Sequence, residues 1–215
     1  MLIFLIYILK KTYREILTEE QIELLPLVKT FKREFYLVGG TAIALHIGHR
    51  RSVDFDLFKY NKLKKKQIAD KIEKNGFSFQ QLYQSDEELT VVVNSVKMTF
   101  YSYPYQIFHP LHFDKIISLP DLLDLAAMKA FALGRWAKWK DYTDLYFILK
   151  NHYSLRQLSD RAFEIFAKLF SEKLFRQQLC YFTDINYSEK VEFVSDEISD
   201  EEIKNFLTDI ATTPF

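Results

Sequence analysis

A glycine pair directly follows a short apolar run, and it strongly constrains the fold of the first half. Residues 35–38 have the composition of a buried strand, Gly39 and Gly40 interrupt it, and residues 41–47 carry a helical pattern. Glycines let the backbone approach a bulky anion, and a helix start offers unpaired N–H groups and a positive dipole end. Many such turns bind nothing, but the geometry predicts a possible phosphate site at this turn.

Two aspartates follow in the next apparent strand. Residues 53–58 are Val, Asp, Phe, Asp, Leu and Phe, so an acidic side chain follows each of the first two apolar ones. This alternation is typical of a strand. Asp54 and Asp56 stand at i and i+2, so they are expected on one face of the strand. The flanking apolar residues are expected on the opposite, buried face: Val53, Phe55 and Leu57.

The aspartate pair predicts a metal site. Neighbouring carboxylates repel each other unless a cation lies between them, and hard oxygen ligands suit Mg²⁺ or Mn²⁺ completed by phosphate oxygens. A lone Asp-x-Asp is more often the solvated face of an edge strand. Here Asp54 comes thirteen residues after Thr41, and the helix between them would bring the chain back as a neighbouring strand. We therefore expect the phosphate cradle and the metal ligands to converge.

The remaining pattern divides the chain into a mixed half and a helical half. Thr18 and Gln21 resemble a capping box that opens a helix through about Thr30. Further expected elements are a lysine-rich helix over 61–74, strands over 77–83, 88–94 and 96–101, and helices over 120–135, 141–151, 155–169, 171–181 and 200–211. This order predicts an α+β fold, with a small mixed β-sheet flanked by helices and followed by a helical C-terminal half.

Composition narrows the setting. The 215 residues carry a formal net charge of zero, so the whole molecule lacks the basic footprint of non-specific nucleic-acid binding. A single cysteine, Cys180, excludes an internal disulfide and suits the cytoplasm. The apolar residues 1–9 are too few to span a bilayer and lack the features of a signal peptide. We expect no membrane association and interpret this run as a packed helix or strand, or an upstream extension.

Two blocks of sequence resemble a known family. The first reads Gly39-Gly-Thr-Ala…Gly48-His-Arg-x-Ser-x-Asp-Phe-Asp-Leu-Phe58, and the second reads Asp124-Leu-Ala-Ala-Met-Lys129…Arg135…Lys140-Asp141-Tyr-Thr-Asp144-Leu-Tyr146. Together they resemble the abortive-infection nucleotidyltransferase toxins of the AbiEii/AbiGii type, within the polymerase-β-like nucleotidyltransferase superfamily. The resemblance covers roughly residues 36–150.

The resemblance implies a nucleotidyltransferase fold, an NTP substrate and Mg²⁺. It assigns the triphosphate to Gly39, Gly40 and Thr41, the metal to Asp54 and Asp56, and a phosphate contact to Lys129, while Asp141 completes the site and Asp144 braces its helix. A core over 1–118 would then be followed by a helical region over 119–215 that contributes Lys129 and Asp141 to the same site.

Other interpretations of the same side chains remain open. Arg50 and Arg51 either neutralise phosphate or pair with Asp54. Lys129 also fits a helix lysine that extends from a packed face, and Asp141 a residue that caps a helix.

The implied function is transfer of NMP to an acceptor, either an RNA 3′ end such as that of tRNA or a protein side chain. The protein would be the toxin of a toxin–antitoxin or abortive-infection pair, with a cognate antitoxin as partner. One departure bears on this, because Thr99 stands where the superfamily usually places a third carboxylate. The alternatives are a non-catalytic binding or antitoxin module that keeps this fold, and a small-molecule (antibiotic) nucleotidyltransferase.

Overall fold

The computed structural model describes residues 7–8, 12–133, 138–183, 185–194 and 197–214. The chain divides into two compact units, Met1–Asp121 and Leu122–Phe215. Within the described residues, no helix is long and apolar enough to cross a membrane.

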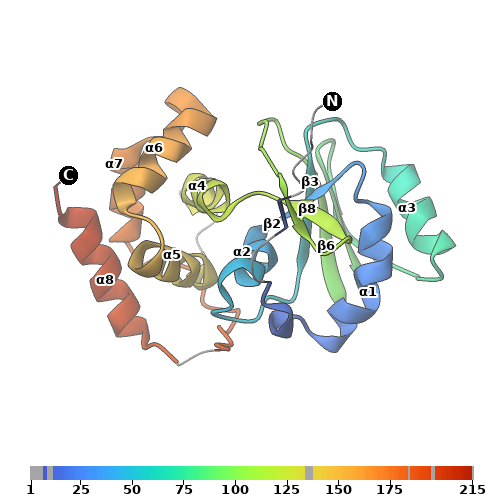
Figure 1. The fold of residues 1–215 in the computed structure, drawn as a ribbon, viewed down its shortest axis with the longest axis horizontal. Coiled ribbons are helices and arrows are strands. Elements are labelled where there is room, and N and C mark those ends of the chain that lie inside the picture. Colours follow the sequence, from blue (N-terminus) through green and yellow to red (C-terminus); the bar gives the residue numbers. More distant parts are fainter. Residues whose placement is uncertain (1–6, 9–11, 134–137, 184, 195–196, 215) are drawn as a thin grey trace. The chain divides into compact units, whose positions relative to one another are not determined.

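The first unit is built on a mixed sheet, which Figure 1 shows edge-on with its helices. Its described strands are β1 (Tyr7–Ile8), β2 (Tyr36–Val38), β3 (Phe55–Lys59), β4 (Gln80–Gln84), β5 (Glu88–Val93), β6 (Val96–Ser102), β7 (Leu111–Phe113) and β8 (Ile117–Leu119). Their order across the sheet is β1-β7-β8-β2-β3-β6-β5-β4. The strand β2, which leads into the glycines, and the strand β3, which contains Asp56, are neighbours near its centre.

Three α-helices cover the sheet: α1 (Glu19–Thr30), α2 (Gly39–Ile47) and α3 (Lys65–Lys74), with a short 3-10 turn over Arg14–Ile16. The α1 and α3 helices lie on one face and α2 on the other (Figure 1). Phe31, directly after α1, packs edge-on against Phe100 of β6 at 4.9 Å between ring centroids. The opposite face of β3 and β6 therefore carries Asp56 and Thr99, because side chains alternate along a strand.

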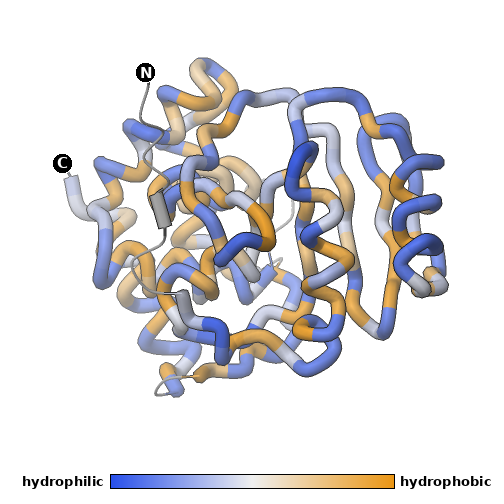
Figure 2. Tube along the Cα trace, turned by 45° about the vertical axis from the view of Figure 1, so that its right-hand side comes forward, coloured by the Kyte–Doolittle hydropathy of each residue, from blue (hydrophilic) through white to orange (hydrophobic). Residues whose placement is uncertain are grey.

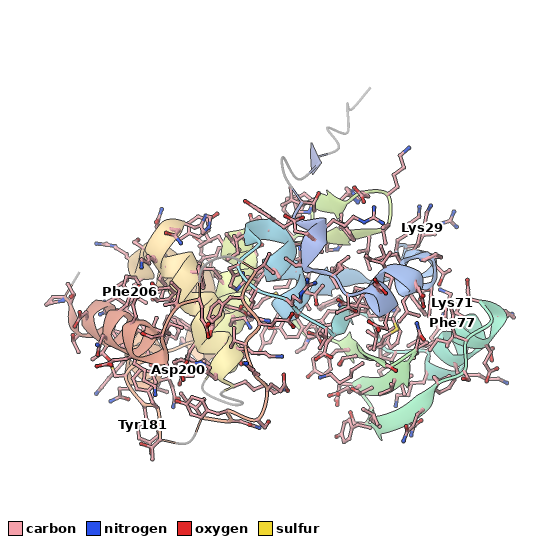
Figure 3. The ribbon with its side chains drawn as sticks, turned by 90° about the horizontal axis from the view of Figure 1, so that it is seen from below. Lys29, Lys71, Phe77, Tyr181, Asp200 and Phe206 are labelled. Atoms are coloured by element: carbon pink, nitrogen blue, oxygen red, sulfur yellow. The ribbon has the colours of Figure 1, made fainter. Side chains whose placement is uncertain are left out.

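The second unit is helical, as its sequence periodicity predicts. Its described elements are α4 (Leu122–Leu133), α5 (Trp139–Asn151), α6 (Leu155–Phe166), a 3-10 turn (Ala167–Leu169), α7 (Glu172–Leu179) and α8 (Asp200–Thr212). Figure 3 labels Asp200 at the start of α8 and Phe206 farther along it. Phe206 packs edge-on against Tyr146 of α5, with ring centroids 5.1 Å apart.

Hydrophilic and hydrophobic residues are interspersed along the chain (Figure 2). The sequence pattern predicted most of the helices and strands correctly. It also predicted the Thr18–Gln21 capping box at the start of α1, in which both reciprocal hydrogen bonds are present. The resulting α+β architecture, a mixed sheet with helices followed by a helical unit, confirms the predicted fold class.

Three details of the sequence interpretation were wrong or incomplete. The strands β7 and β8 were not predicted, because each has only three residues, too few for a clear alternation; they pair with each other and with the distant strands β1 and β2. Val53 is 44% exposed instead of buried, because β3 begins only at Phe55. The glycines are the first residues of α2 and not a break before it. Of the apolar run at 1–9, only Tyr7–Ile8 is described, as strand β1.

Candidate functional site

Gly39 and Gly40 make room for three side chains of the same unit. A Cβ on Gly39, whose φ is +72°, would overlap the Oδ2 atom of Asp56. A Cβ on Gly40 would lie 2.7 Å from Nη2 of Arg50 and 2.9 Å from Oγ of Ser52. The Asp56 carboxylate therefore lies directly against the first residue of α2. Contacts within the protein are thus sufficient to require glycine at both positions, whether or not an anion binds there.

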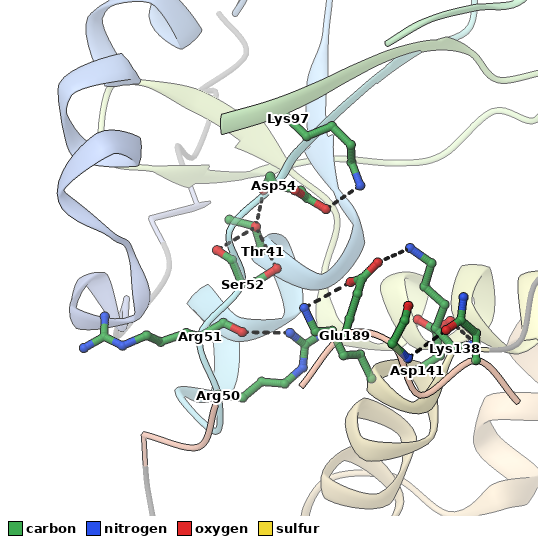
Figure 4. A network of polar contacts seen from close by, with 12 residues as sticks. Thr41, Arg50, Arg51, Ser52, Asp54, Lys97, Lys138, Asp141 and Glu189 are labelled. Atoms are coloured by element: carbon green, nitrogen blue, oxygen red, sulfur yellow. Dashed lines mark hydrogen bonds and ion pairs between the residues drawn. The ribbon is translucent and has the colours of Figure 1, made fainter. Parts of the chain in front are cut away.

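A hydrogen-bond network fixes the backbone at Asp54. Thr41 is 1% exposed, and its hydroxyl donates to the Asp54 carbonyl oxygen and lies 3.0 Å from the Ser52 hydroxyl (Figure 4). Gln21, which is fully buried, donates from Nε2 to the same carbonyl at 3.4 Å. The start of α1 and the start of α2 thus hold one peptide group, which sets the position of the Asp54 side chain.

The Thr41 hydroxyl is consequently hydrogen-bonded to other residues of the protein. Its hydroxyl faces Ser52 and Asp54, so its backbone N–H is the group left at the start of α2 to meet a phosphate. Its assignment to the triphosphate stays a prediction. Sequence reasoning missed Gln21 and Ser52 as parts of this network, although the capping box had already placed Gln21 at the start of α1.

The register of the sheet brings Asp56 and Thr99 together. Val38 pairs with Asp56 across the antiparallel β2–β3 ladder, and Asp56 pairs with Thr99 across the parallel β3–β6 ladder. Thr99 in turn pairs with Thr90 of β5, whose hydroxyl donates to Oε1 of Glu88 at 2.6 Å. The side chain beside Asp56 in β6 is thus the hydroxyl-bearing Thr99. The carboxylate of Glu88 belongs to β5, one strand farther away.

Asp54 forms an ion pair that the sequence did not predict. Nζ of Lys97 lies 2.6 Å from Oδ2 of Asp54, and the two side chains are 33% and 26% exposed (Figure 4). Lys97 lies in β6 two residues before Thr99. Pairing of Asp54 with Arg50 or Arg51 was one of two interpretations left open by the sequence, and Lys97 of β6 is a partner that the sequence did not indicate.

Arg50 is buried under the start of α2. Its side chain is among the largest that are fully enclosed, and Nη1 donates to the Arg51 carbonyl oxygen at 2.8 Å. Its Nη2 lies against Gly40. A permanent positive charge at this depth raises the potential at the helix start, so Arg50 can act on an anion there through the field without touching it.

The two aspartates fit a magnesium site that substrate completes. No group of three or more His, Cys, Asp or Glu residues that could hold a metal occurs among the residues described. Mg²⁺ commonly binds through one or two carboxylates and takes its remaining ligands from water and substrate phosphates. Asp56, which lies against the start of α2, and Asp54, which immediately precedes β3, are the two carboxylates that would supply such a pair.

In the helical unit, the second block places a lysine between two carboxylates. Nζ of Lys129, in α4, lies 2.6 Å from Oδ1 of Asp141 and 3.0 Å from Oδ2 of Asp144, both in α5. Lys129 is 9% and Asp144 0% exposed, whereas Asp141 is 24% exposed. Asp141 also accepts a hydrogen bond from the Lys138 backbone at 3.3 Å, so it caps α5 as well (Figure 4).

Neighbouring charges of this unit have structural roles. Asp124 is buried and binds Arg161 of α6 in a bidentate pair, with distances of 2.5 and 3.1 Å. This pairing raises the pKa of Arg161. Asp124 therefore joins α4 to α6 instead of serving chemistry. Arg135 of the same block lies outside the described residues.

Glu189 was not singled out in the sequence, yet it ties a loop to the start of α5. Lys138 and Lys140 approach its two carboxylate oxygens at 2.6 and 3.1 Å. Burial alone raises the pKa of Glu189, but the hydrogen bonds and charges of the two lysines outweigh it and lower that pKa to about 2. No local sequence pattern marks this contact, because Glu189 is far from both lysines along the chain.

Solved structures share this architecture. MenT4, a nucleotidyltransferase toxin from Mycobacterium tuberculosis, superposes with a TM-score of 0.58 and 12% identity over 90% of this chain and 82% of that one. JHP933 from Helicobacter pylori gives a TM-score of 0.52 and 16% identity over 91% of each chain. At these identities the likeness shows the fold, and it confirms a nucleotidyltransferase fold.

Sequence comparison identifies the family. An uncharacterized protein of Aquifex aeolicus (strain VF5), aq_aa25, is 33% identical over 130 residues, a match that covers 58% of this chain and 63% of that protein. The chain thus spans less than two thirds of that relative's length. A family model described as "Nucleotidyl transferase AbiEii toxin, Type IV TA system" matches residues 27–214. Because this match covers most of the sequence, the chain belongs to the AbiEii nucleotidyltransferase toxin family.

Proposed function

We propose that the protein transfers a nucleotidyl group from an NTP to an acceptor hydroxyl, with a divalent metal held by Asp54 and Asp56. The observation that carries this proposal is the Asp56 carboxylate lying against Gly39 at the start of α2. Two features that each favour a triphosphate, a carboxylate pair for Mg²⁺ and a helix N-terminus for phosphate, thereby occur at one place.

In the proposed reaction, the acceptor oxygen bonds to the α-phosphorus, the bond from that phosphorus to the β-bridging oxygen breaks, and pyrophosphate leaves. A bound Mg²⁺ supplies neutralisation of the phosphate charge. The backbone at Gly39, Gly40 and Thr41 orients the β- and γ-phosphates, and buried Arg50 adds positive potential. Asp54 and Asp56 are held in place by the network around them.

We also propose that Lys129 and Asp141 act in this reaction. Support comes from the family match, which includes their segment, and from the partial exposure of Asp141. Lys129 is paired with two carboxylates, so a phosphate must compete with Asp141 for its ammonium. Because position 99 carries no carboxylate, Asp141 is the candidate to take up the proton of the acceptor hydroxyl.

The first test measures transfer of a labelled nucleotidyl group to an acceptor. Incubation with Mg²⁺, total RNA or total protein and each NTP labelled at the α-phosphate should label one acceptor, whereas a γ-phosphate label should not transfer. Asp54→Asn and Asp56→Asn should each abolish the transfer, because each removes a metal ligand. As a control, Asp86→Asn removes an acidic charge from the loop between β4 and β5 and should leave transfer unchanged.

The acceptor and the partner follow from the same assay. If the label is on RNA and is lost when the 3′-terminal nucleotides are removed, the acceptor is an RNA 3′ end. If the label survives nuclease treatment but not protease treatment, the acceptor is a protein. As a member of a toxin family, the protein is proposed to have a cognate antitoxin that relieves its toxicity. No transfer of any α-label, with NTP still bound, would favour a non-catalytic module, to which the hydroxyl of Thr99 beside Asp56 also points.

A further inference from the structure

The ion pair between Lys97 and Asp54 has no part in the transfer reaction as proposed above. Nζ of Lys97 lies 2.6 Å from Oδ2 of Asp54, and both side chains are roughly one-third exposed, so ions from solvent can reach them. A carboxylate oxygen that binds an ammonium group at this distance is partly neutralised. A divalent cation that binds Asp54 must therefore compete with Lys97 for the same oxygen.

The sheet places Lys97 on the side where the substrate is expected. Because Phe55 pairs with Met98 and Asp56 with Thr99 in the parallel β3–β6 ladder, Asp54 falls beside Lys97. Alternate residues of a strand share a face, so Lys97 and Thr99 lie on the same face of β6 as each other. The Lys97 ammonium is thus next to the carboxylate pair and not behind the sheet.

We propose that Lys97 is a counter-ion for Asp54 in the metal-free protein and moves to the triphosphate when metal and NTP bind together. This inference rests on the proposed function and names a further binding residue for that substrate. As a binding residue, Lys97 would set the order and strength of metal and nucleotide binding without making or breaking a covalent bond.

Counting charge shows why one lysine has two opposite effects. With Lys97, the two aspartates and the lysine carry a net charge of −1, and a divalent cation changes it to +1. Without Lys97, the pair carries −2 and a cation only neutralises it. Lys97 therefore weakens binding of the metal alone and strengthens binding of a polyanion to the metal-loaded site.

This arrangement makes metal and nucleotide binding strongly cooperative. The metal displaces Lys97 from Asp54 at a cost, and a triphosphate recovers that cost by accepting the ammonium in a charge-assisted contact. Metal then binds weakly alone and tightly with nucleotide, and linkage requires the same factor for the reverse order. Removing Lys97 should reduce this common factor.

The test is Lys97→Met, which keeps the aliphatic stem and removes the charge. Titration calorimetry with Mn²⁺ alone should show tighter binding by about fivefold, the range of a part-exposed ion pair. Binding of an α,β-methylene NTP analogue in the presence of Mg²⁺ should weaken by about tenfold, because a charged hydrogen bond to phosphate is lost. Opposite changes in the two affinities are not expected from a residue that only supports the fold.

Three control variants isolate the effect. Lys97→Arg keeps the charge and should bind Mn²⁺ as weakly as the wild type. Lys74→Met removes the same charge from an exposed position in α3 and should change neither affinity. Lys97→Gln provides a second neutral variant if Lys97→Met does not fold, and thermal melting of each variant checks the fold.

The outcomes separate this inference from the proposed function. If neutral variants at Lys97 bind Mn²⁺ no more tightly than the wild type, the inference is overturned while the metal site of Asp54 and Asp56 stands. If the analogue binds equally well without Lys97, the transfer of the ammonium to phosphate is likewise overturned. If the wild type binds no Mn²⁺ even with the analogue present, the proposed function fails, and the inference fails with it.

Discussion

At the scale of single residues, Gly39 carries two separate constraints. Its φ of +72° disfavours any side chain, and a Cβ there would overlap the Asp56 carboxylate. Gly76, at the end of α3, has a similar φ of +83° but open space around it. The two glycines therefore allow the backbone strain to be measured separately from the displacement of Asp56.

Gly39→Ala should destabilise the protein more than Gly76→Ala and should weaken Mn²⁺ binding, because Asp56 must move. Urea unfolding should show a loss of about 1 kcal/mol for Gly76→Ala, from strain alone. Gly39→Ala should lose about 2–4 kcal/mol, since overpacking adds to the same strain. Equal losses for the two variants, with unchanged Mn²⁺ affinity, would show that Asp56 is not held against Gly39.

At the scale of elements, the pairing of α4 and α5 through Lys129 makes a stability prediction as well as a functional one. Asp144 is fully buried and lies 3.0 Å from Lys129. Lys129→Ala removes that ammonium, and it should lower the free energy of unfolding by about 3 kcal/mol, the scale of a broken buried ion pair. Loss of transfer in this variant must therefore be measured on protein shown to be folded.

A second substitution separates the two effects of Lys129. Adding Asp144→Asn to Lys129→Ala removes the buried negative charge and should recover part of the lost stability while transfer stays absent. Lys168→Ala, at an exposed position of the same unit, should change neither property. Recovery of transfer in the double variant would mean that Lys129 only supports the fold.

The loop that carries Glu189 predicts a pH dependence for the start of α5. The pKa of Glu189 is lowered to about 2 in the folded protein, below the value of about 4.3 for an unpaired glutamate. Its contribution to stability is thus present above pH 4.3 and is lost as the pH falls toward 2.

Glu189→Gln should lower the stability of the protein at pH 7 by up to about 1 kcal/mol, because solvent screens a pair this exposed. At pH 2 or below the variant and the wild type should unfold at nearly equal urea concentrations. A difference of the same size at both pH values would exclude the ion pairs with Lys138 and Lys140 as its cause.

At the scale of the whole molecule, the proposed site predicts coupling between metal and nucleotide. In the absence of metal, the negative charges of an NTP and of Asp54 and Asp56 repel each other, although Lys97 partly neutralises Asp54. Calorimetry with ATP, GTP, CTP and UTP should show binding that Mg²⁺ strengthens by at least about tenfold. Metal-independent binding, or no binding of any NTP, would contradict the enzymatic proposal and favour a non-catalytic module.

What could be predicted from the sequence was mostly local. The helices, the Thr18–Gln21 capping box and the strand before Gly39 each follow from neighbours a few residues apart, and the structure confirms them. The aspartate pair and the glycines were found in the same way, although their roles remain predictions.

What was missed depends on pairing between distant segments. Lys97 meets Asp54 only because β3 and β6 run parallel, which no local periodicity reveals. The strands β7 and β8 are too short to carry a pattern, and β8 joins the centre of the sheet through its pairing with the distant strand β2. Glu189 reaches Lys138 and Lys140 from a loop. These contacts needed the topology, and with it the long-range register, before they could be seen.

The parallel pairing of β2 with β8 also has a consequence in time. Tyr36 pairs with Ser118, so the strand that leads into Gly39 gains its neighbour on that side only from residues 117–119. Closing so long a stretch of chain is slow compared with forming a helix. During synthesis, a ribosome will have made more than half of the protein before this strand can be enclosed. The turn at Gly39, where we propose that phosphate binds, would then stay unassembled through that interval, and the proposed transfer activity would begin only after it.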